Sequence, residues 1–308
     1  MKRYRRARED GVAIIMALLT TTLATVLAAS VIGGAGLAVD SLQGRRDHAQ
    51  ALQLALGGVD YARAVLAEDA RRTSYDHAAE TWSTPLPAYD TGHGVISGRI
   101  EERQGCWSIN NLAPKGETDV QALQVFRRLL LLLDLPQELA DNAAFHIADP
   151  VDSPAASALQ GWYAQQLPPR LPAHRPLADF SELRMIRGFD AAVTKILSPY
   201  VCVLPVFAAV NVNTASAVVL AAVVADLDLA AAQRVVGERA VAPFRDLADF
   251  ANRARVNIGS DRKALDVSSR FFVVHASAFL GQATVNVDAL LHRRPGDVWP
   301  AVLWRARR

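Results

Sequence analysis

The sequence predicts an α+β protein in which a long N-terminal transmembrane helix packs on a small antiparallel sheet, with a large α-helical domain inserted in the sheet. Three observations lead to this prediction. An uncharged run fills residues 11–39, strand patterns occur at residues 95–112 and again after residue 270, and the stretch between them has helical apolar spacing. Strands on both sides of a helical block indicate one sheet that the block interrupts.

The composition is that of a folded protein with unevenly placed charge. Of the 308 residues, 51% are hydrophobic and 21% are charged, which is enough apolar material for a packed core. Five of the 33 basic and two of the 31 acidic side chains lie in residues 1–11, which leaves 28 against 29 in the remainder. A near-neutral body argues against a nucleic-acid binder that works by neutralising phosphates.

Residues 11–39 are long enough to cross a bilayer as a helix. At about 1.5 Å per residue, such a run exceeds a hydrocarbon core of about 30 Å. The basic residues precede the run, so the positive-inside rule places the N-terminus in the cytoplasm and everything after about Asp40 outside it. We expect Gly33, Gly34 and Gly36 to loosen the far end of this helix.

The junction before the apolar run allows three interpretations. A secretory signal peptide would be cut near Ala28-Ala29-Ser30, and an uncut signal anchor is the simplest alternative. The third is that the short basic leader ending in Gly11 resembles the leader of type IV prepilins, which a prepilin peptidase removes after the glycine. Glycine suits such a cut because it lacks a Cβ and lets the backbone extend into a protease. The mature chain would then begin at Val12.

Helical periodicity continues beyond the membrane and is followed by strands. Leu52, Leu56, Val59, Ala62 or Arg63, and Leu66 form one stripe, which predicts that the first helix extends and packs on the sheet. A polar loop is expected at Arg71–Gly94. Strands are predicted from alternation at Val95–Glu102, Cys106–Leu112, Arg270–Ala278, Ala283–Leu290 and Pro300–Arg305.

The stretch from about Ala113 to Leu265 is predicted to be helical. Val120, Leu123, Phe126, Leu130 and Leu133 mark its first buried helix, which Pro136 ends. A faint internal repeat pairs Arg175–Phe180 with Ala242–Leu247, each a proline turn before a short helix.

The segment Val210–Ala215 is a helix-start signal. Asn213 or Thr214 is placed to cap a helix beginning near Ala215. The segment also resembles the opening of a helix-hairpin-helix module, so a membrane-anchored DNA-binding protein is the alternative function. That module grips phosphate with a glycine hairpin, whereas Val223–Leu229 has no glycine and two acids.

The cysteines and histidines point to no reaction centre. Cys106 and Cys202 are far apart and form no C-x-x-C pair, which argues against zinc and leaves either a disulfide or two buried thiols. The sequence has no His-Glu-x-x-His, no Gly-x-Ser-x-Gly and no phosphate loop, so no enzyme activity is predicted. His275 is expected to be structural or exposed, and Trp299 and Trp304 to serve sheet packing or an interface.

Several weak motifs occur together in one order. They are the leader and membrane helix, Ile109-Asn110-Asn111-Leu112, the Arg175–Gly188 segment, the Pro199–Ala215 stretch and the closing strands. Met16 stands at the fifth position counted from Val12, where most pilin-like proteins carry glutamate. In this order and in this missing glutamate the chain resembles the K-type minor pseudopilins of type II secretion systems, the GspK family.

The resemblance implies an assembly role. It implies a leader at 1–11, a transmembrane helix at 12–39, a pseudopilin core at 40–112 and 266–308, and an inserted helical domain at 113–265. It also implies an inner-membrane subunit with a periplasmic body, which caps the pseudopilus tip during export of folded proteins. The implied partners are I-type and J-type minor pseudopilins, other pseudopilins and the prepilin peptidase, with no nucleic acid. A tip subunit has no subunit beyond it to pair with, which fits Met16.

Relatives of this type hold calcium in the insert, which makes calcium a possible cofactor. Only Asp149 and Asp152 remain here as candidate carboxylates, because Leu159 and Gln160 stand where the resemblance expects an acidic pair. Calcium takes several oxygen ligands. The preferred alternative is therefore a solvated loop in which the aspartates cap turns.

Overall fold

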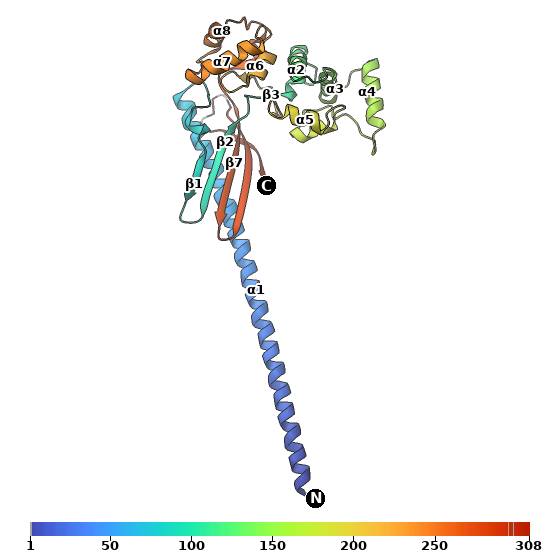
Figure 1. The fold of residues 1–308 in the computed structure, drawn as a ribbon, viewed down its shortest axis with the longest axis vertical. Coiled ribbons are helices and arrows are strands. Elements are labelled where there is room, and N and C mark those ends of the chain that lie inside the picture. The colour runs from blue at the N-terminus through green and yellow to red at the C-terminus, as the bar shows by residue number, and fades with distance from the viewer. Residues whose placement is uncertain (1, 295, 298) are drawn as a thin grey trace.

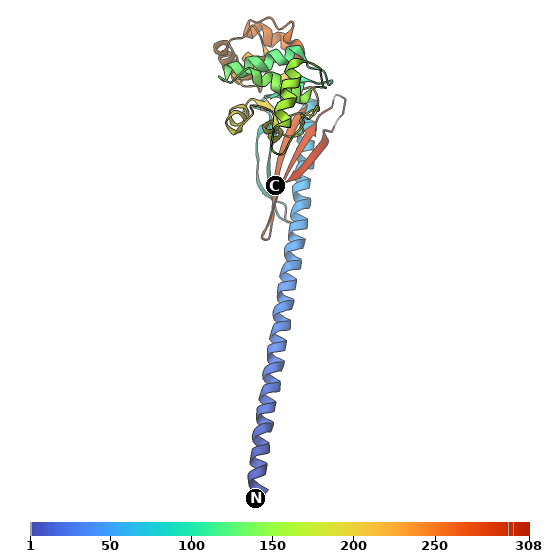
Figure 2. The same cartoon turned by 90° about the vertical axis from the view of Figure 1, so that its right-hand side faces the viewer.

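The computed structural model describes residues 2–294, 296–297 and 299–308, and the side chains of residues 2–10, 36 and 37 lie outside that description. The first element is a single helix, α1 (Lys2–Arg72), of 71 residues. Its first half projects alone and its second half lies along the sheet (Figures 1 and 2). Gly33 and Gly34 lie inside the continuous helix, so the helix does not end there, and a loosening by these glycines stays a prediction.

The sheet has five antiparallel strands in the order β1-β2-β7-β8-β9. Long β2 pairs with β7 from Val95 opposite Phe279 to Glu102 opposite Phe272. The chain leaves the sheet after β2 and returns at β7, as the sequence predicted. The strands are β1 (Leu86–Asp90), β2 (Val95–Glu102), β7 (Phe271–Leu280), β8 (Ala283–His292) and β9 (Ala301–Arg307).

Two strand predictions were wrong. Strand β1 lies within the stretch expected to be a polar loop, and Pro87 hid it, because proline is tolerated on an edge strand but weakens the strand signal. The expected strand Cys106–Leu112 keeps only β3 (Trp107–Ser108), which pairs in parallel with β4 (Val201–Cys202). The rest is a 3₁₀ helix, η2 (Ile109–Leu112), whose side chains are buried among the helices.

Small residues bring α1 close to the sheet. Ala51, Ala55, Val59, Ala62 and Leu66 are at most 4% exposed and pack on β7 and β8. The buried residues of α1 differ in part from the stripe that the sequence predicts. Leu52 and Leu56 belong to the predicted stripe, but they are only half-buried and lie beside the buried residues. A Cβ on Gly58 would lie 3.3 Å from the Ala276 Cβ, so the helix is nearly in backbone contact with the sheet.

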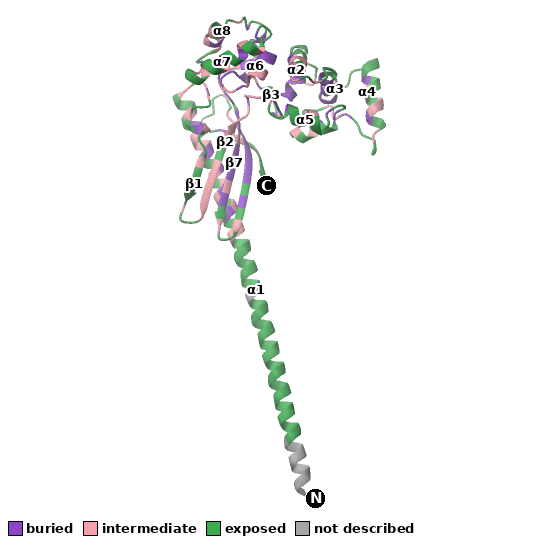
Figure 3. Ribbon diagram, viewed as in Figure 1, coloured by how far each residue is buried: buried purple, intermediate pink, exposed green. Residues whose placement is uncertain are grey.

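The helical block forms a second, larger core beside one end of the sheet (Figure 3). Trp107 stacks on Phe126 with ring centroids 5.0 Å apart in its interior. A further parallel pair, β5 (Val210–Asn211) with β6 (Leu265–Asp266), closes the block. The predicted fold class is therefore confirmed. The helices are α2 (Val120–Leu132), α3 (Glu138–Ile147), α4 (Pro154–Ala164), α5 (Ala191–Leu197), α6 (Ala217–Val223), α7 (Leu229–Val241) and α8 (Leu247–Ala254), with 3₁₀ helices η1 (Thr81–Ser83), η3 (Phe180–Met185) and η4 (Asp261–Ala264).

Buried asparagines hold the block's irregular segments together. Asn110 donates to the carbonyls of Leu177 and Leu204, at 2.9 and 2.8 Å, and accepts the Leu177 N–H. Asn213 makes the same two-way contact with the backbone of Phe244. The expected cap at Asn213 or Thr214 is wrong, because the cap of α6 is Ser216. Buried backbone groups need partners, and these amides supply them.

The open question about the cysteines has a structural answer. Cys106 and Cys202 form a disulfide with Cα atoms 5.8 Å apart. Cys106 follows β2 and Cys202 lies in β4, so the bond ties the end of the sheet to the helical block. An oxidising compartment is where such a bond persists.

Candidate assembly interface

The outstanding surface of the molecule is the free half of α1. Residues 11–35 are all exposed, including Ile15 at 65% and Ile32 at 72%. Isolated apolar side chains on a surface are ordinary, but a continuous apolar helix without a partner is not stable in water. Within the described residues, this is the one helix long and apolar enough to cross a membrane.

The polar groups in this run are satisfied inside the helix. Thr21 and Thr22 donate to carbonyls three and four residues earlier, at 2.9–3.0 Å, and Ser30 donates to the Leu27 carbonyl at 2.8 Å. Such back-bonding removes the need for water. The run therefore suits either lipid or the helices of other subunits, where hydroxyl-bearing and small residues allow close approach.

Charged residues return at Asp40, shortly before α1 reaches the sheet. Arg45 and Arg46 are exposed, and His48 one turn later contacts the Arg307 guanidinium of β9. Farther along, the Nε of Arg63 donates to the Pro300 carbonyl at 2.8 Å. The first contact fixes the end of the last strand close to the level where the apolar surface ends, and the second fixes the start of that strand about four helical turns farther along α1.

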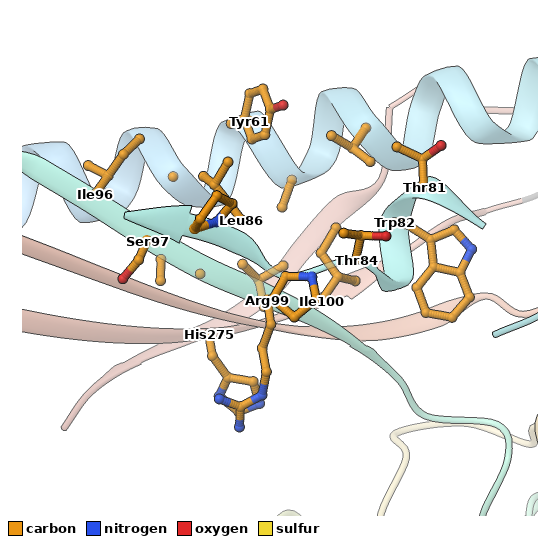
Figure 4. A pocket seen from close by; sticks show the side chains of 18 residues that line it. Tyr61, Thr81, Trp82, Thr84, Leu86, Ile96, Ser97, Arg99, Ile100 and His275 are labelled. Carbon is orange, nitrogen blue, oxygen red and sulfur yellow. The ribbon is translucent and has the colours of Figure 1, made fainter. Parts of the chain in front are cut away.

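An apolar pocket of about 230 Å³ lies between α1 and the β1–β2 edge. Figure 4 shows Tyr61, Ile96 and Leu86 around it, while Arg99 and His275 extend away from α1 on the other face of the sheet. The pocket is therefore mainly apolar on the side of α1, and the charged ends of Arg99 and His275 lie away from that helix.

A buried ionic cluster joins the end of α1 to the sheet. Arg293 bonds both carboxylate oxygens of Asp76, the Asp69 carboxylate at 3.3 Å and the Ser269 carbonyl at 2.7 Å. Burial and the neighbouring Glu80 and Asp76 carboxylates raise the pKa of Asp69 to about 7. Three carboxylates within 4.8 Å of one another, of which Arg293 bonds only Asp69 and Asp76, favour a proton on one of them.

Glu102 is a further, half-buried acid at this junction. It accepts the Ser269 hydroxyl at 2.7 Å and the Gly105 N–H at 2.8 Å, and burial raises its pKa. Nearby, Arg239 of α7 donates to the Val212 carbonyl at 2.7 Å, and burial lowers its pKa to about 10. The junction between sheet and block is therefore specified by polar contacts as well as by the disulfide.

The exposed face of the sheet carries an ionic row across its strands. His275 of β7 lies between Glu101 of β2, at 3.2 Å, and Asp288 of β8, at 2.7 Å. Arg103 pairs with Glu101, and Arg308 with Asp288. The hydrogen bond that the Nε2–H of His275 donates to Glu101 raises the pKa of His275, and the same bond lowers the pKa of Glu101 to about 2. His275 is thus structural, as the sequence suggested.

The predicted site residues are not brought together. Gly11, Val12 and Met16 lie along exposed α1, far in sequence from Asp149 and Asp152 on an exposed loop before α4. The described acidic and histidine side chains include one group that could share an ion, namely Asp69, Asp76 and Glu80, and Arg293 already occupies it. Two exposed carboxylates do not fit calcium's ligand demand, so we derive no role through calcium, and its binding stays a prediction.

The α6–α7 turn, where a helix-hairpin-helix module would hold phosphate, is occupied by carboxylates. Asp228 accepts the Ala231 N–H at 2.7 Å, and Asp261 accepts the Ala225 N–H at 2.9 Å. Backbone donors already bonded to acids offer little to a phosphate group. The observation weighs against the DNA-binding alternative.

An apolar helix that projects from a small antiparallel sheet and lacks a partner along its first half defines the class of pilin-like assembly subunits. Models of the family described as type II secretion system (T2SS), protein K match residues 105–206 and 210–268. The chain is 31% identical to the type II secretion system protein K of Pseudomonas aeruginosa, over 95% of this chain and 92% of the relative. The chain therefore belongs to the type II secretion system protein K family.

Further comparisons agree on family and fold. The protein K of Klebsiella pneumoniae is 30% identical over 93% of each chain. A solved structure, that of the GspK-GspI-GspJ complex from the enterotoxigenic Escherichia coli type 2 secretion system, aligns with 23% identity and a TM-score of 0.71. The match covers 87% of this chain and 99% of that one. At this identity the structural likeness shows the fold, a long N-terminal helix, a sheet and a helical block.

Proposed function

We propose that this protein is a minor pseudopilin that caps the tip of a periplasmic pseudopilus and takes part in export of folded proteins across the outer membrane. The observation that carries the proposal is the unpartnered apolar half of α1 attached to a body widened by the helical block. The related GspK forms a complex with GspI and GspJ, which supports I-type and J-type minor pseudopilins as partners here.

The shape of the body supports a tip position. Subunits inside a filament built from parallel helices have to be narrow enough for neighbours to pack on every side. Here the helical block spreads sideways from the axis of α1 (Figures 1 and 2). A subunit of this width fits where one end of the filament is free. The proposed division into leader, membrane helix, core and insert, at residues 1–11, 12–39, 40–112 with 266–308, and 113–265, goes with this role.

Processing and topology follow from the same proposal. A prepilin peptidase would cut between Gly11 and Val12, and the helix would have to unwind locally there, which glycine makes easier. The basic residues ahead of the span would keep the N-terminus on the cytoplasmic side of the inner membrane. The role is assembly without catalysis, and the disulfide suits a periplasmic body.

Labelling of assembled pseudopili tests the tip position. Gold-conjugated antibodies against the helical block are expected at one end of each filament, and label along the whole length would contradict the proposal.

Removal of the gene tests export. A folded secreted protein is expected to accumulate in the periplasm and to leave it again when the intact gene is returned, and unchanged secretion would contradict the export role.

A further inference from the structure

The two edges of the sheet are not alike. Strand β1 is blocked as an edge, because Pro87 has no N–H and the pairing with β2 shifts register between Leu86 and Tyr89. Strand β9 has neither proline nor cover over its last five residues, which are all exposed. Half-exposed Trp304 lies in this uncovered stretch. Proteins usually shield an edge strand that carries large apolar side chains, so an unshielded edge of this kind indicates a binding surface.

The register shows which backbone groups of β9 are free. The Arg308 N–H donates to the Asn286 carbonyl at 3.2 Å, and Ala306 stands opposite Asp288. Since alternate residues of an edge strand bond to the same neighbour, the N–H and C=O groups of Arg305 and Arg307 face away from the sheet. These groups can accept an additional antiparallel or parallel strand.

The open edge is also basic. Arg305 and Arg307 share the face of β9 directed toward α1, where Arg307 contacts His48, and Arg45 lies one turn below His48 on the same side of the helix. Among the side chains that the structure describes, none of these three arginines has a carboxylate at ion-pair distance. Arg308 on the other face already pairs with Asp288. The unneutralised charge complements an acidic strand.

The edge is continuous with the proposed assembly surface. The contact between Arg307 and His48 places the end of β9 where α1 leaves the sheet and its apolar half begins. A subunit whose helix packs on that half therefore carries its own body close to β9.

We propose that the edge of β9 binds an extended acidic segment of a neighbouring minor pseudopilin by strand addition. Backbone groups of Arg305 and Arg307 bond the added strand, and carboxylates at alternate positions of that strand, two residues apart, face the two arginine side chains. This inference rests on the proposed function, since it names how one partner subunit docks.

The test uses the full chain in detergent with the I-type and J-type minor pseudopilins of the same organism. Hydrogen exchange is measured for residues 301–307 in the free chain and in the assembly. The amides of Arg305 and Arg307 are expected to become protected only in the assembly. The variant Arg305→Pro removes the N–H of residue 305 that faces away from the sheet, while the hydrogen bonds between β9 and β8 remain. Because the variant loses one hydrogen bond to the added strand and one positive charge, we expect it to weaken assembly about tenfold. Arg305→Ala removes the charge alone and has a smaller effect, and Arg294→Ala, an exposed arginine off the edge, is the matched control.

The outcomes separate the two proposals. If the three chains do not assemble at all, the proposed function fails and strand addition fails with it. If they assemble while residues 301–307 exchange freely and Arg305→Pro assembles like the parent chain, strand addition alone is overturned. Protection of the edge by phosphatidylglycerol vesicles without partner subunits, equally in Arg305→Pro, would assign the arginines to the membrane surface and also overturn it.

Discussion

Arg293 and Asp76, 217 positions apart in the chain, form a buried two-oxygen ion pair at the joint between α1, the sheet and the helical block. The Asp76 side chain is 2% exposed and that of Arg293 13%. The guanidinium also covers the Phe272 ring at 5.1 Å. One arginine from the end of β8 therefore fixes the chain that leaves α1.

Arg293→Met is expected to destabilise the full chain by about 3–5 kcal/mol, because it leaves the Asp76 charge buried without its partner. Denaturant unfolding in detergent measures the change, and Arg294→Met is the control because its side chain is exposed. Equal unfolding midpoints for the two variants would show that the pair does not hold the joint.

Asp69→Asn is expected to stabilise the chain at pH 8 by roughly 1 kcal/mol, a figure that allows for solvent screening. The folded-state pKa of Asp69 is about 7 against an ordinary value of 3.8, so the folded state binds more protons between these values. Stability of the parent chain should therefore fall as pH rises from about 4 to 7, and the variant should lose that part of the fall. Asp60→Asn, on exposed α1, should leave the profile unchanged.

His275→Gln is expected to remove a separate pH dependence. The raised pKa of His275 contributes stability that is complete below about 6.5 and is lost as pH rises through the folded value. The lowered pKa of Glu101 contributes stability that is complete above about pH 4.5, the ordinary pKa of a glutamate, and is lost as the pH falls toward 2. Arg99 on β2, Arg103 just after β2, Asp288 on β8 and Arg308 also face this row. Unfolding followed from pH 3 to 9 should show the variant flatter on both sides, and an unchanged slope above pH 6.5 would contradict the bridge.

The double variant Cys106→Ser/Cys202→Ser is expected to lose about 2–4 kcal/mol, because the bond closes a chain segment of 96 positions. Reductant should lower the unfolding midpoint of the parent chain to that of the variant and leave the variant unaffected. Two free thiols in the protein isolated from its native cells, detected by alkylation and mass spectrometry, would contradict the bond.

Local patterns predicted much of the fold. The uncharged run, the helical stripe at Val59 and Leu66 and the alternation along β7 and β8 depend on neighbours in the sequence, so they could be recognised without a structure. Strand β1 was missed because proline at an edge imitates a loop. The apolar pattern of Cys106–Leu112 predicts a strand, but burial among helices produces a similar pattern.

Long-range contacts could not be predicted in the same way. The residues next to Asn213 do not indicate that its side chain bonds the backbone of Phe244, because the same pattern also predicts a helix cap. The bond between Cys106 and Cys202 and the pairing of Arg293 with Asp76 depend on how the block sits on the sheet. The processing residues Gly11 and Val12 came from a junction pattern, and their role stays a prediction.

The mature N-terminus tests the central claim, that this chain is a processed pseudopilin, most directly. Intact-mass and peptide mass spectrometry would compare cells with and without a prepilin peptidase. We expect a start at Val12, N-methylated, that disappears without the peptidase and in Gly11→Val. An uncut chain in every case, or a start near Val31, would contradict the account.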